Sequence, residues 1–191
     1  MAEIVLFHHA GGLTEGVLDF AEKLRIVGHT VHTPDLFEGH TFADVEEGVA
    51  WAQARAGEDE RVFADRAKAF VATLPTTELV YGGMSMGCAR AAERVIYGEG
   101  ALAAFFLYGA VDPAWWDKKW PADVPAEAHV TEEDPWRELE AEEGFVKGIA
   151  KAELFTYPGT GHLFLEPGHP DYDEELAHIV TSSIIDFLDE V

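Results

Sequence analysis

The stretch Tyr81–Arg90 reads YGGMSMGCAR, and it decides how the rest of the chain is interpreted. Its centre, Gly83–Gly87, fits the pattern G-x-S-x-G around Ser85. The apolar run ELVY precedes it, and an alanine-rich helical pattern, CARAAERVIY, follows. A serine on a sharp turn between a strand and a helix needs small residues two positions to either side. We therefore expect a strand–turn–helix unit that exposes Ser85, and the alternative is a glycine-rich turn without chemistry.

On both sides of this unit, short apolar runs alternate with amphipathic stretches, which predicts an α/β fold with mainly parallel strands joined by helices. The runs are almost continuously apolar, as expected when helices cover both faces of the sheet. Six strands are expected, at Ile4–Phe7, Thr30–Thr33, Leu79–Tyr81, Ala103–Tyr108, Ala128–Thr131 and Leu154–Tyr157.

Helical spacing of apolar residues predicts the helices between these strands. They are expected around Val17–Leu24, ended by Gly28, and at Asp59–Leu74, Met86–Tyr97 and Glu174–Val191. We expect residues 1–191 to form one domain, with active groups at the carboxyl ends of the strands.

The chain is strongly acidic, because 13 Lys and Arg against 36 Asp and Glu give a net charge of −23. Such a field repels phosphate backbones and anionic lipid headgroups, so we expect neither nucleic acid nor a membrane as partner. One cysteine cannot form an internal disulfide, and the N-terminal MAEIVLFHHAGG lacks the features of a signal peptide. We expect a cytoplasmic protein, either a monomer or a homodimer.

A serine hydroxyl needs a base to attack a carbonyl. Where G-x-S-x-G forms such a turn, the acid and then the histidine follow the serine along the chain. His162, in TYPGTGHLF, comes directly after the last expected strand. For the acid, AHVTEEDPW offers Glu132, Glu133 and Asp134. We choose Asp134, because Pro135 marks a loop tip that should turn inward, and keep Glu133 as the second choice.

The loop FHHAGGL after the first expected strand should supply a second oxyanion donor. We expect the N–H groups of Ala10 and Met86 to bind the developing oxyanion. A metal site at His8 and His9 is the competing interpretation. It is disfavoured because adjacent histidines point in different directions and no ligand spacing accompanies them, so we expect no metal and no cofactor.

Tryptophans crowd the proline-flanked segment 111–127. Such a loop either overhangs a ligand cleft or covers one end of the sheet. We expect Trp115 and Trp116, with Phe37, to line an apolar substrate pocket, and the alternative that Trp115, Trp116 and Trp120 cap the core stays open.

At this point the sequence resembles the dienelactone hydrolase family within the α/β-hydrolase fold. The segments that carry the resemblance are VLFHHAGGL at 5–13, HTPDLFEGHTF at 32–42, YGGMSMGCA at 81–89, EEDPW at 132–136 and YPGTGHLF at 157–164. The resemblance implies a catalytic triad of Ser85, Asp134 and His162, an oxyanion hole of Ala10 and Met86, and no cofactor. That fold usually begins with antiparallel strands. Here the first expected helix follows the first expected strand at the very start of the chain, so we expect the leading strands to be trimmed.

Three departures from the lactone-cleaving members limit what the resemblance implies. Those members have cysteine where this chain has Ser85, and we expect Cys88 to pack inertly in the helix. They carry a glutamate where this chain has His9, and an arginine that holds the substrate carboxylate where it has Glu166. Ordinary Ser–His general-base catalysis is therefore expected, and a carboxylate-bearing dienelactone is disfavoured because Glu166 would repel it.

The expected function is a serine hydrolase that cleaves a neutral carboxylic ester, lactone or thioester. A non-catalytic binding module of the same fold, and a dienelactone hydrolase proper, remain the alternatives.

Overall fold

A computed structural model describes residues 1–59 and 61–191 of the chain. Its centre is a six-stranded sheet in the order β2-β1-β3-β4-β5-β6, and all neighbouring strands are parallel. The strands are β1 (Glu3–Phe7), β2 (Thr30–His32), β3 (Leu79–Met84), β4 (Ala101–Leu107), β5 (Ala126–Thr131) and β6 (Ala152–Tyr157). All six predicted strands are confirmed, as is the α/β class.

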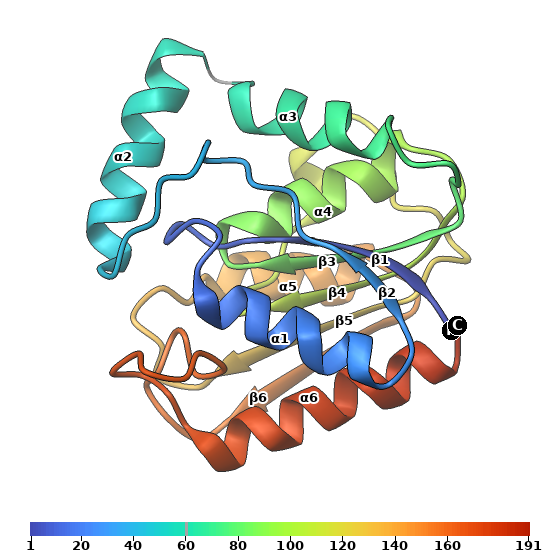
Figure 1. The fold of residues 1–191 in the computed structure, drawn as a ribbon. Coiled ribbons are helices and arrows are strands. Elements are labelled where there is room, and N and C mark those ends of the chain that lie inside the picture. Colours follow the sequence, from blue (N-terminus) through green and yellow to red (C-terminus); the bar gives the residue numbers. More distant parts are fainter. Residues whose placement is uncertain (60) are drawn as a thin grey trace.

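Helices cover both faces of this sheet (Figure 1). They are α1 (Glu15–Ile26), α2 (Val45–Glu58), α3 (Val62–Val71), α4 (Met86–Tyr97), α5 (Leu139–Gly148) and α6 (Glu174–Asp189). Helices α1 and α6 lie on one face, α3, α4 and α5 lie on the other, and α2 stands near the carboxyl ends of the strands (Figure 1).

Two helices, α2 and α5, are absent from the sequence-based prediction. Within α2 only Gly48 and Ala52 are buried, so the helix lacks the stripe of large apolar residues on which the prediction depends. The helix predicted at 59–74 corresponds to α3, while Asp59 ends α2 by donating its backbone N–H to Arg55. Position 60 of that prediction lies outside the described residues.

Alternate residues of the central strands enter two separate cores. In β1, Ile4 and Leu6 pack with α1 and α6, whereas Val5 and Phe7 pack with α4. All four are fully buried, and each such side chain contributes about 1.5–3 kcal/mol relative to an exposed one. This two-sided burial explains why the strands are nearly continuous apolar runs, and it fixes the carboxyl edge of the sheet as a rigid base for the loops above it.

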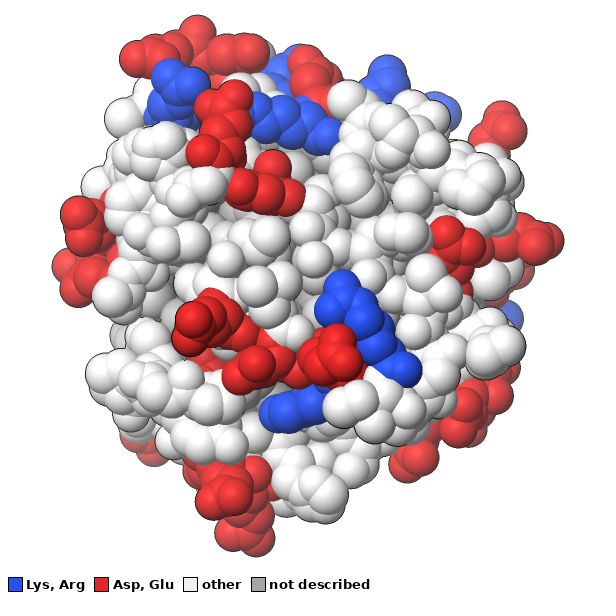
Figure 2. All heavy atoms as spheres, viewed as in Figure 1, with Lys and Arg blue, Asp and Glu red and all other residues white. Residues whose placement is uncertain are grey.

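Acidic side chains outnumber basic ones on the face seen in Figure 2, in line with the net charge of −23. Within residues 1–59 and 61–191, no helix combines the length and the apolar character needed to cross a membrane.

Candidate active site

The turn between β3 and α4 holds Ser85 in a conformation that non-glycine residues rarely adopt, with φ 50° and ψ −115°. The residues two positions to either side of it, Gly83 and Gly87, must be glycine. A Cβ on Gly87 would lie 2.2 Å from the Phe7 carbonyl oxygen, and a Cβ on Gly83 would lie 2.5 Å from the Cα of Cys88. The backbone N–H of Ser85 donates to Leu107 of β4 at 2.7 Å, which fixes the turn to the sheet. The strain is held by this surrounding structure, as is usual at functional sites.

Ser85, His162 and Asp134 form a hydrogen-bonded chain at this edge of the sheet. The Ser85 hydroxyl lies 2.9 Å from His162 Nε2, and His162 Nδ1 lies 2.7 Å from Asp134 Oδ2. Both partners are buried, His162 with 2% and Asp134 with 7% of its surface exposed. When Nδ1–H donates this hydrogen bond to Asp134, Nε2 carries no proton and is free to take one from the serine. The three residues that the sequence singled out are thus brought together in space.

Several backbone contacts hold the His162 loop in place. Asp171 Oδ2 accepts hydrogen bonds from the backbone N–H of His162 at 3.0 Å and of Leu163 at 3.3 Å. The Thr131 hydroxyl, at the end of β5, donates to the Gly161 carbonyl at 2.9 Å. Asp171 was not among the residues expected from the sequence. Its only local signal is a carboxylate after Pro170, and such a residue has no fixed spacing from the histidine.

The loop after β1 brings Ala10 to the cavity that Ser85 and Met86 also line. Buried His8 holds this loop, because its Nε2 accepts the Leu36 N–H at 3.0 Å and its Nδ1 donates to the His9 carbonyl at 2.7 Å. Met86 is the first residue of α4, where backbone N–H groups have no partner within the helix. Both residues expected to supply oxyanion donors therefore line the same cavity as Ser85.

His8 gives the first testable prediction. Burial lowers the pKa of His8 from 6.5 to about 4, so the folded protein binds the proton less readily than the unfolded chain does. The stability due to neutral His8 is present above pH 6.5 and is lost as the pH falls towards 4. At pH 5 this loss is about 2 kcal/mol. The free energy of unfolding in urea should fall from pH 7 to pH 5 by about 2 kcal/mol less in His8→Gln than in the wild type. An equal fall in both proteins would contradict the prediction.

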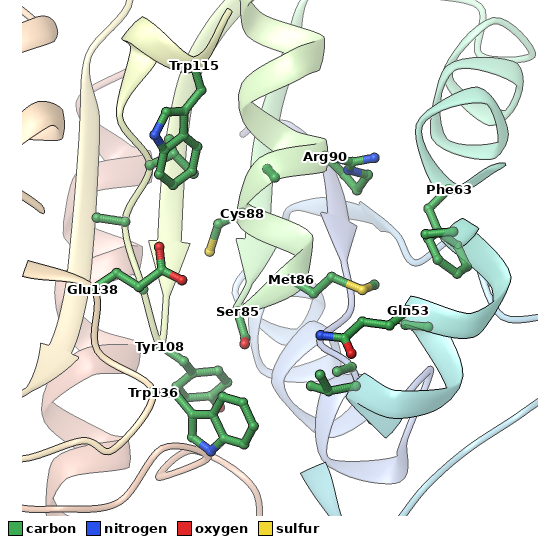
Figure 3. Close-up of a pocket in the computed structure, with 18 residues that line it drawn as sticks. Gln53, Phe63, Ser85, Met86, Cys88, Arg90, Tyr108, Trp115, Trp136 and Glu138 are labelled. Atoms are coloured by element: carbon green, nitrogen blue, oxygen red, sulfur yellow. The ribbon is translucent and has the colours of Figure 1, made fainter. Parts of the chain in front are cut away.

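A cavity of about 500 Å³ opens beside Ser85, between α2, α4 and the segment after β4. Its walls are mainly apolar, from residues such as Val49, Ala56, Phe63 and Val111. In Figure 3 the Ser85 hydroxyl lies between the side chains of Gln53 on one side and Glu138 on the other.

The aromatic residues divide differently from the sequence-based expectation. Trp115 lines the cavity and is 54% exposed. Phe37 and Trp116 are not among the lining residues: Phe37 is fully buried against Trp51 and Phe63, with ring centroids 4.7 and 5.1 Å away. Trp116 is half-buried and donates its indole N–H to Glu93 at 3.4 Å.

Trp120 packs against Phe106 in the core, with its indole N–H on the Val124 carbonyl, so it caps the core. The cavity instead takes Tyr108 and Trp136, which the sequence analysis did not select. Their ring centroids lie 5.6 and 6.1 Å from that of His162. Tyr108 is the last residue of an expected strand and Trp136 follows another, but the directions of their side chains depend on loop geometry.

Cys88 lies in α4 with 2% of its surface exposed, and its Sγ faces the carbonyl oxygens of Gly83 and Leu107 at 3.4 and 3.5 Å. Burial raises the pKa of the Cys88 thiol to about 12. A thiol in this state supplies almost no thiolate at neutral pH, which is the nucleophilic form. Its position fits the expectation that it packs without reacting.

Glu166 does not face the cavity. Its carboxylate contacts His9 and accepts the Thr14 hydroxyl at 3.1 Å, it is 5% exposed, and it is not among the cavity-lining residues. The expectation that Glu166 would repel a substrate carboxylate therefore lacks its structural premise. Residues 1–59 and 61–191 contain no group of three or more His, Cys, Asp or Glu side chains placed to hold a metal ion.

Known proteins resemble this chain in family pattern and in fold. A model of the dienelactone hydrolase family matches residues 1–191. None of the curated protein sequences matches significantly. Among solved structures, a protein called m3DLH has a TM-score of 0.77 at 20% identity, covering 99% of this chain and 86% of its own.

Two further structures are similar. A dienelactone hydrolase-like promiscuous phosphotriesterase, P91, from metagenomic libraries has a TM-score of 0.77 at 17% identity, with 100% of this chain and 86% of its own covered. Dienelactone hydrolase from Anabaena variabilis has a TM-score of 0.65 at 23% identity, with 95% and 84% covered. These likenesses show a shared fold, the α/β-hydrolase fold.

Proposed function

Because the chain belongs to the dienelactone hydrolase family of carboxylic ester hydrolases, we propose that it cleaves its substrate through a covalent acyl intermediate on Ser85. The observation that carries this proposal is the chain of hydrogen bonds from Ser85 through His162 to Asp134, built on a strained turn at the carboxyl edge of the sheet. Residues 1–191 act as one domain, and no cofactor takes part.

In the proposed reaction, Ser85 Oγ attacks the substrate carbonyl while His162 Nε2 takes the hydroxyl proton. Asp134 accepts the Nδ1–H of His162 and stabilises the imidazolium. The tetrahedral intermediate then collapses, and the departing alcohol or thiol takes the proton from His162. A water molecule, deprotonated by the same imidazole, attacks the acyl-Ser85 and releases the carboxylic acid.

The negative charge of each tetrahedral intermediate needs donors that are already in place. The N–H groups of Ala10 and Met86 fill this role, and the amino-terminal end of α4 adds the positive end of its dipole. Removing one such donor costs about 10²–10³ in rate in other acyl-transfer enzymes.

The substrate is a neutral or weakly polar ester, lactone or thioester. The cavity wall is mainly apolar, and its charged side chains are Arg90, which lies 3.6 Å from Glu93, and Glu138. A net charge of −23 also disfavours the approach of anions. Apolar contacts therefore carry most of the substrate binding.

A fluorophosphonate probe tests which residue is the nucleophile. We expect covalent labelling of the wild type and of Cys88→Ala, and none of Ser85→Ala, because the probe reacts with an activated serine and the Cys88 thiol is buried. Labelling that disappears only in Cys88→Ala would overturn the assignment, and no labelling of the folded wild type would favour a binding module.

The cavity predicts which substrates are preferred. Ala56 lines it from α2 and is only half-buried, so Ala56→Leu should fill space without unfolding the protein. Since one methylene in such a pocket is worth about 1–3 kcal/mol, kcat/KM for the longer aryl esters should fall by about tenfold or more, with little change for the acetate.

The matched control is Ala54→Leu, on the exposed side of the same helix, which should leave the profile unchanged. The measurement is kcat/KM over aryl esters of increasing acyl length, with a carboxylated lactone alongside. Equal losses for short and long esters in Ala56→Leu would show that the substrate does not occupy this cavity.

A further inference from the structure

His9, in the loop after β1, and Glu166, which follows His162 by four residues, contact each other. His9 Nε2 faces Glu166 Oε1, and the two residues are only 1% and 5% exposed. Neither lines the substrate cavity. Burying a carboxyl group costs free energy unless a partner compensates it, and His9 is the partner here.

The hydrogen bonds of His9 fix which of its nitrogens carries the proton. The backbone N–H of Gly11 donates to His9 Nδ1 at 2.9 Å, so Nδ1 must be unprotonated. The ring is then neutral, with its proton on Nε2, the nitrogen that faces Glu166 and lies 3.5 Å from the Thr14 hydroxyl. Glu166 thus selects the tautomer that can accept from Gly11.

The His9 imidazole packs against the loop that carries the proposed oxyanion donor, the Ala10 N–H. His9 and Gly11 flank Ala10, and the ring folds over the loop so closely that a Cβ on Gly11 would lie 2.5 Å from it. The hydrogen bond from the Gly11 N–H to the ring ties the residue after Ala10 back to His9, and so restrains the loop around Ala10.

Glu166 also joins this loop to the segment that carries the base. It follows His162 by four residues, and its N–H donates to the Leu163 carbonyl at 3.1 Å. Its Oε2 accepts the hydroxyl of Thr14, which in turn caps α1 by accepting the Val17 N–H at 3.3 Å. Glu166 therefore belongs to the segment that follows His162, while its carboxylate contacts His9, in the loop that carries Ala10, and Thr14, at the start of α1.

We propose that Glu166 and His9 are positioning residues that hold the Ala10 N–H in register with Ser85 and His162, a proposal that rests on the proposed serine hydrolase function. The pair acts on the transition state, because the Ala10 donor is needed only when the carbonyl oxygen becomes an anion. Neither residue touches the substrate.

The first test uses no activity. Nitrogen-15 spectra of the histidines should show His9 as a neutral ring protonated on Nε2 in the wild type, and amide exchange at Gly11 should be slow. In Glu166→Leu we expect a mixture of tautomers and faster exchange at Gly11. A His9 ring protonated on Nδ1 in the wild type would overturn the proposal.

The second test separates positioning from general stability. Glu166→Leu should lower kcat/KM for an aryl ester by about 10- to 100-fold. It should weaken the binding of a boronic acid, which forms a tetrahedral anion on serine, by the same factor. Inhibition by the neutral alcohol analogue of the ester, which forms no adduct, should stay unchanged. Glu166→Gln, which keeps an oxygen acceptor for His9, should restore activity to within about threefold of wild type.

Glu127→Leu is the matched control, because Glu127 is also a buried glutamate beside a buried histidine, with Oε1 3.3 Å from His129, near the opposite end of β5. It should lose stability but keep the ratio of boronic acid to alcohol inhibition. Wild-type ratios in Glu166→Leu would overturn the positioning role while leaving the proposed function intact. Absence of Ser85 labelling in the wild type would instead refute the proposed function.

Discussion

Replacing Ser85 with alanine is expected to lower kcat/KM for aryl esters by a factor on the order of 10⁵. The hydroxyl lies 2.9 Å from His162 Nε2 and lines the cavity, and Cys88 cannot replace it as the nucleophile, since Cys88 is buried and burial raises the pKa of its thiol to about 12. The measurement is steady-state hydrolysis, with the folded state checked by circular dichroism.

A second variant separates lost chemistry from lost structure. Ser85 has φ 50°, which glycine adopts without strain, so Ser85→Gly should be as inactive as the alanine variant but more stable by about 1–3 kcal/mol. A Ser85→Ala protein that keeps more than about a hundredth of the activity would exclude the acyl-Ser85 mechanism.

Replacing Asp134 with asparagine should reduce kcat by about 10³- to 10⁴-fold. The carboxylate accepts a hydrogen bond from His162 Nδ1, with 2.7 Å between Nδ1 and Oδ2. An asparagine amide can instead donate to that nitrogen, and so favour the tautomer that cannot take the serine proton. The three side chains keep their places, so KM and the unfolding temperature should change little.

Glu133→Gln is the matched control, because Glu133 is the neighbouring carboxylate and its side chain is exposed. It should keep wild-type activity. If instead Glu133→Gln is the inactive variant and Asp134→Asn turns over normally, the orienting acid has been assigned to the wrong residue.

Much of the framework follows from local patterns. All six strands were predicted from short runs of mainly apolar residues; helices bury β1, β3, β4 and β5 almost completely, whereas the edge strands β2 and β6 are only partly buried. Helix α2 could not be predicted, because its contact with the sheet region is made through small residues: a Cβ on Gly48 would lie 2.1 Å from the Ala10 carbonyl oxygen. Close packing of this kind leaves no apolar stripe in the sequence.

The composition of the cavity was predicted less well. Phe37 and Trp116 were expected there because they are aromatic and lie in loops, yet Phe37 packs into the core and Trp116 bonds to Glu93. Tyr108 and Trp136 take their place beside His162. An aromatic residue in a loop has no periodicity that reports its direction, so composition alone could not choose among them.

The sequence by itself determined the strand–turn–helix unit around Ser85 and the order in which an acid and a histidine follow it. These are local properties, since apolar runs specify strands and the crowded turn tolerates only glycine at 83 and 87. Only the tertiary structure decided that Asp134 rather than Glu133 reaches His162, and that Glu166 turns away from the cavity to meet His9. Those choices depend on the directions in which separate loops leave neighbouring strands, and these directions arise from packing between segments that are distant along the chain.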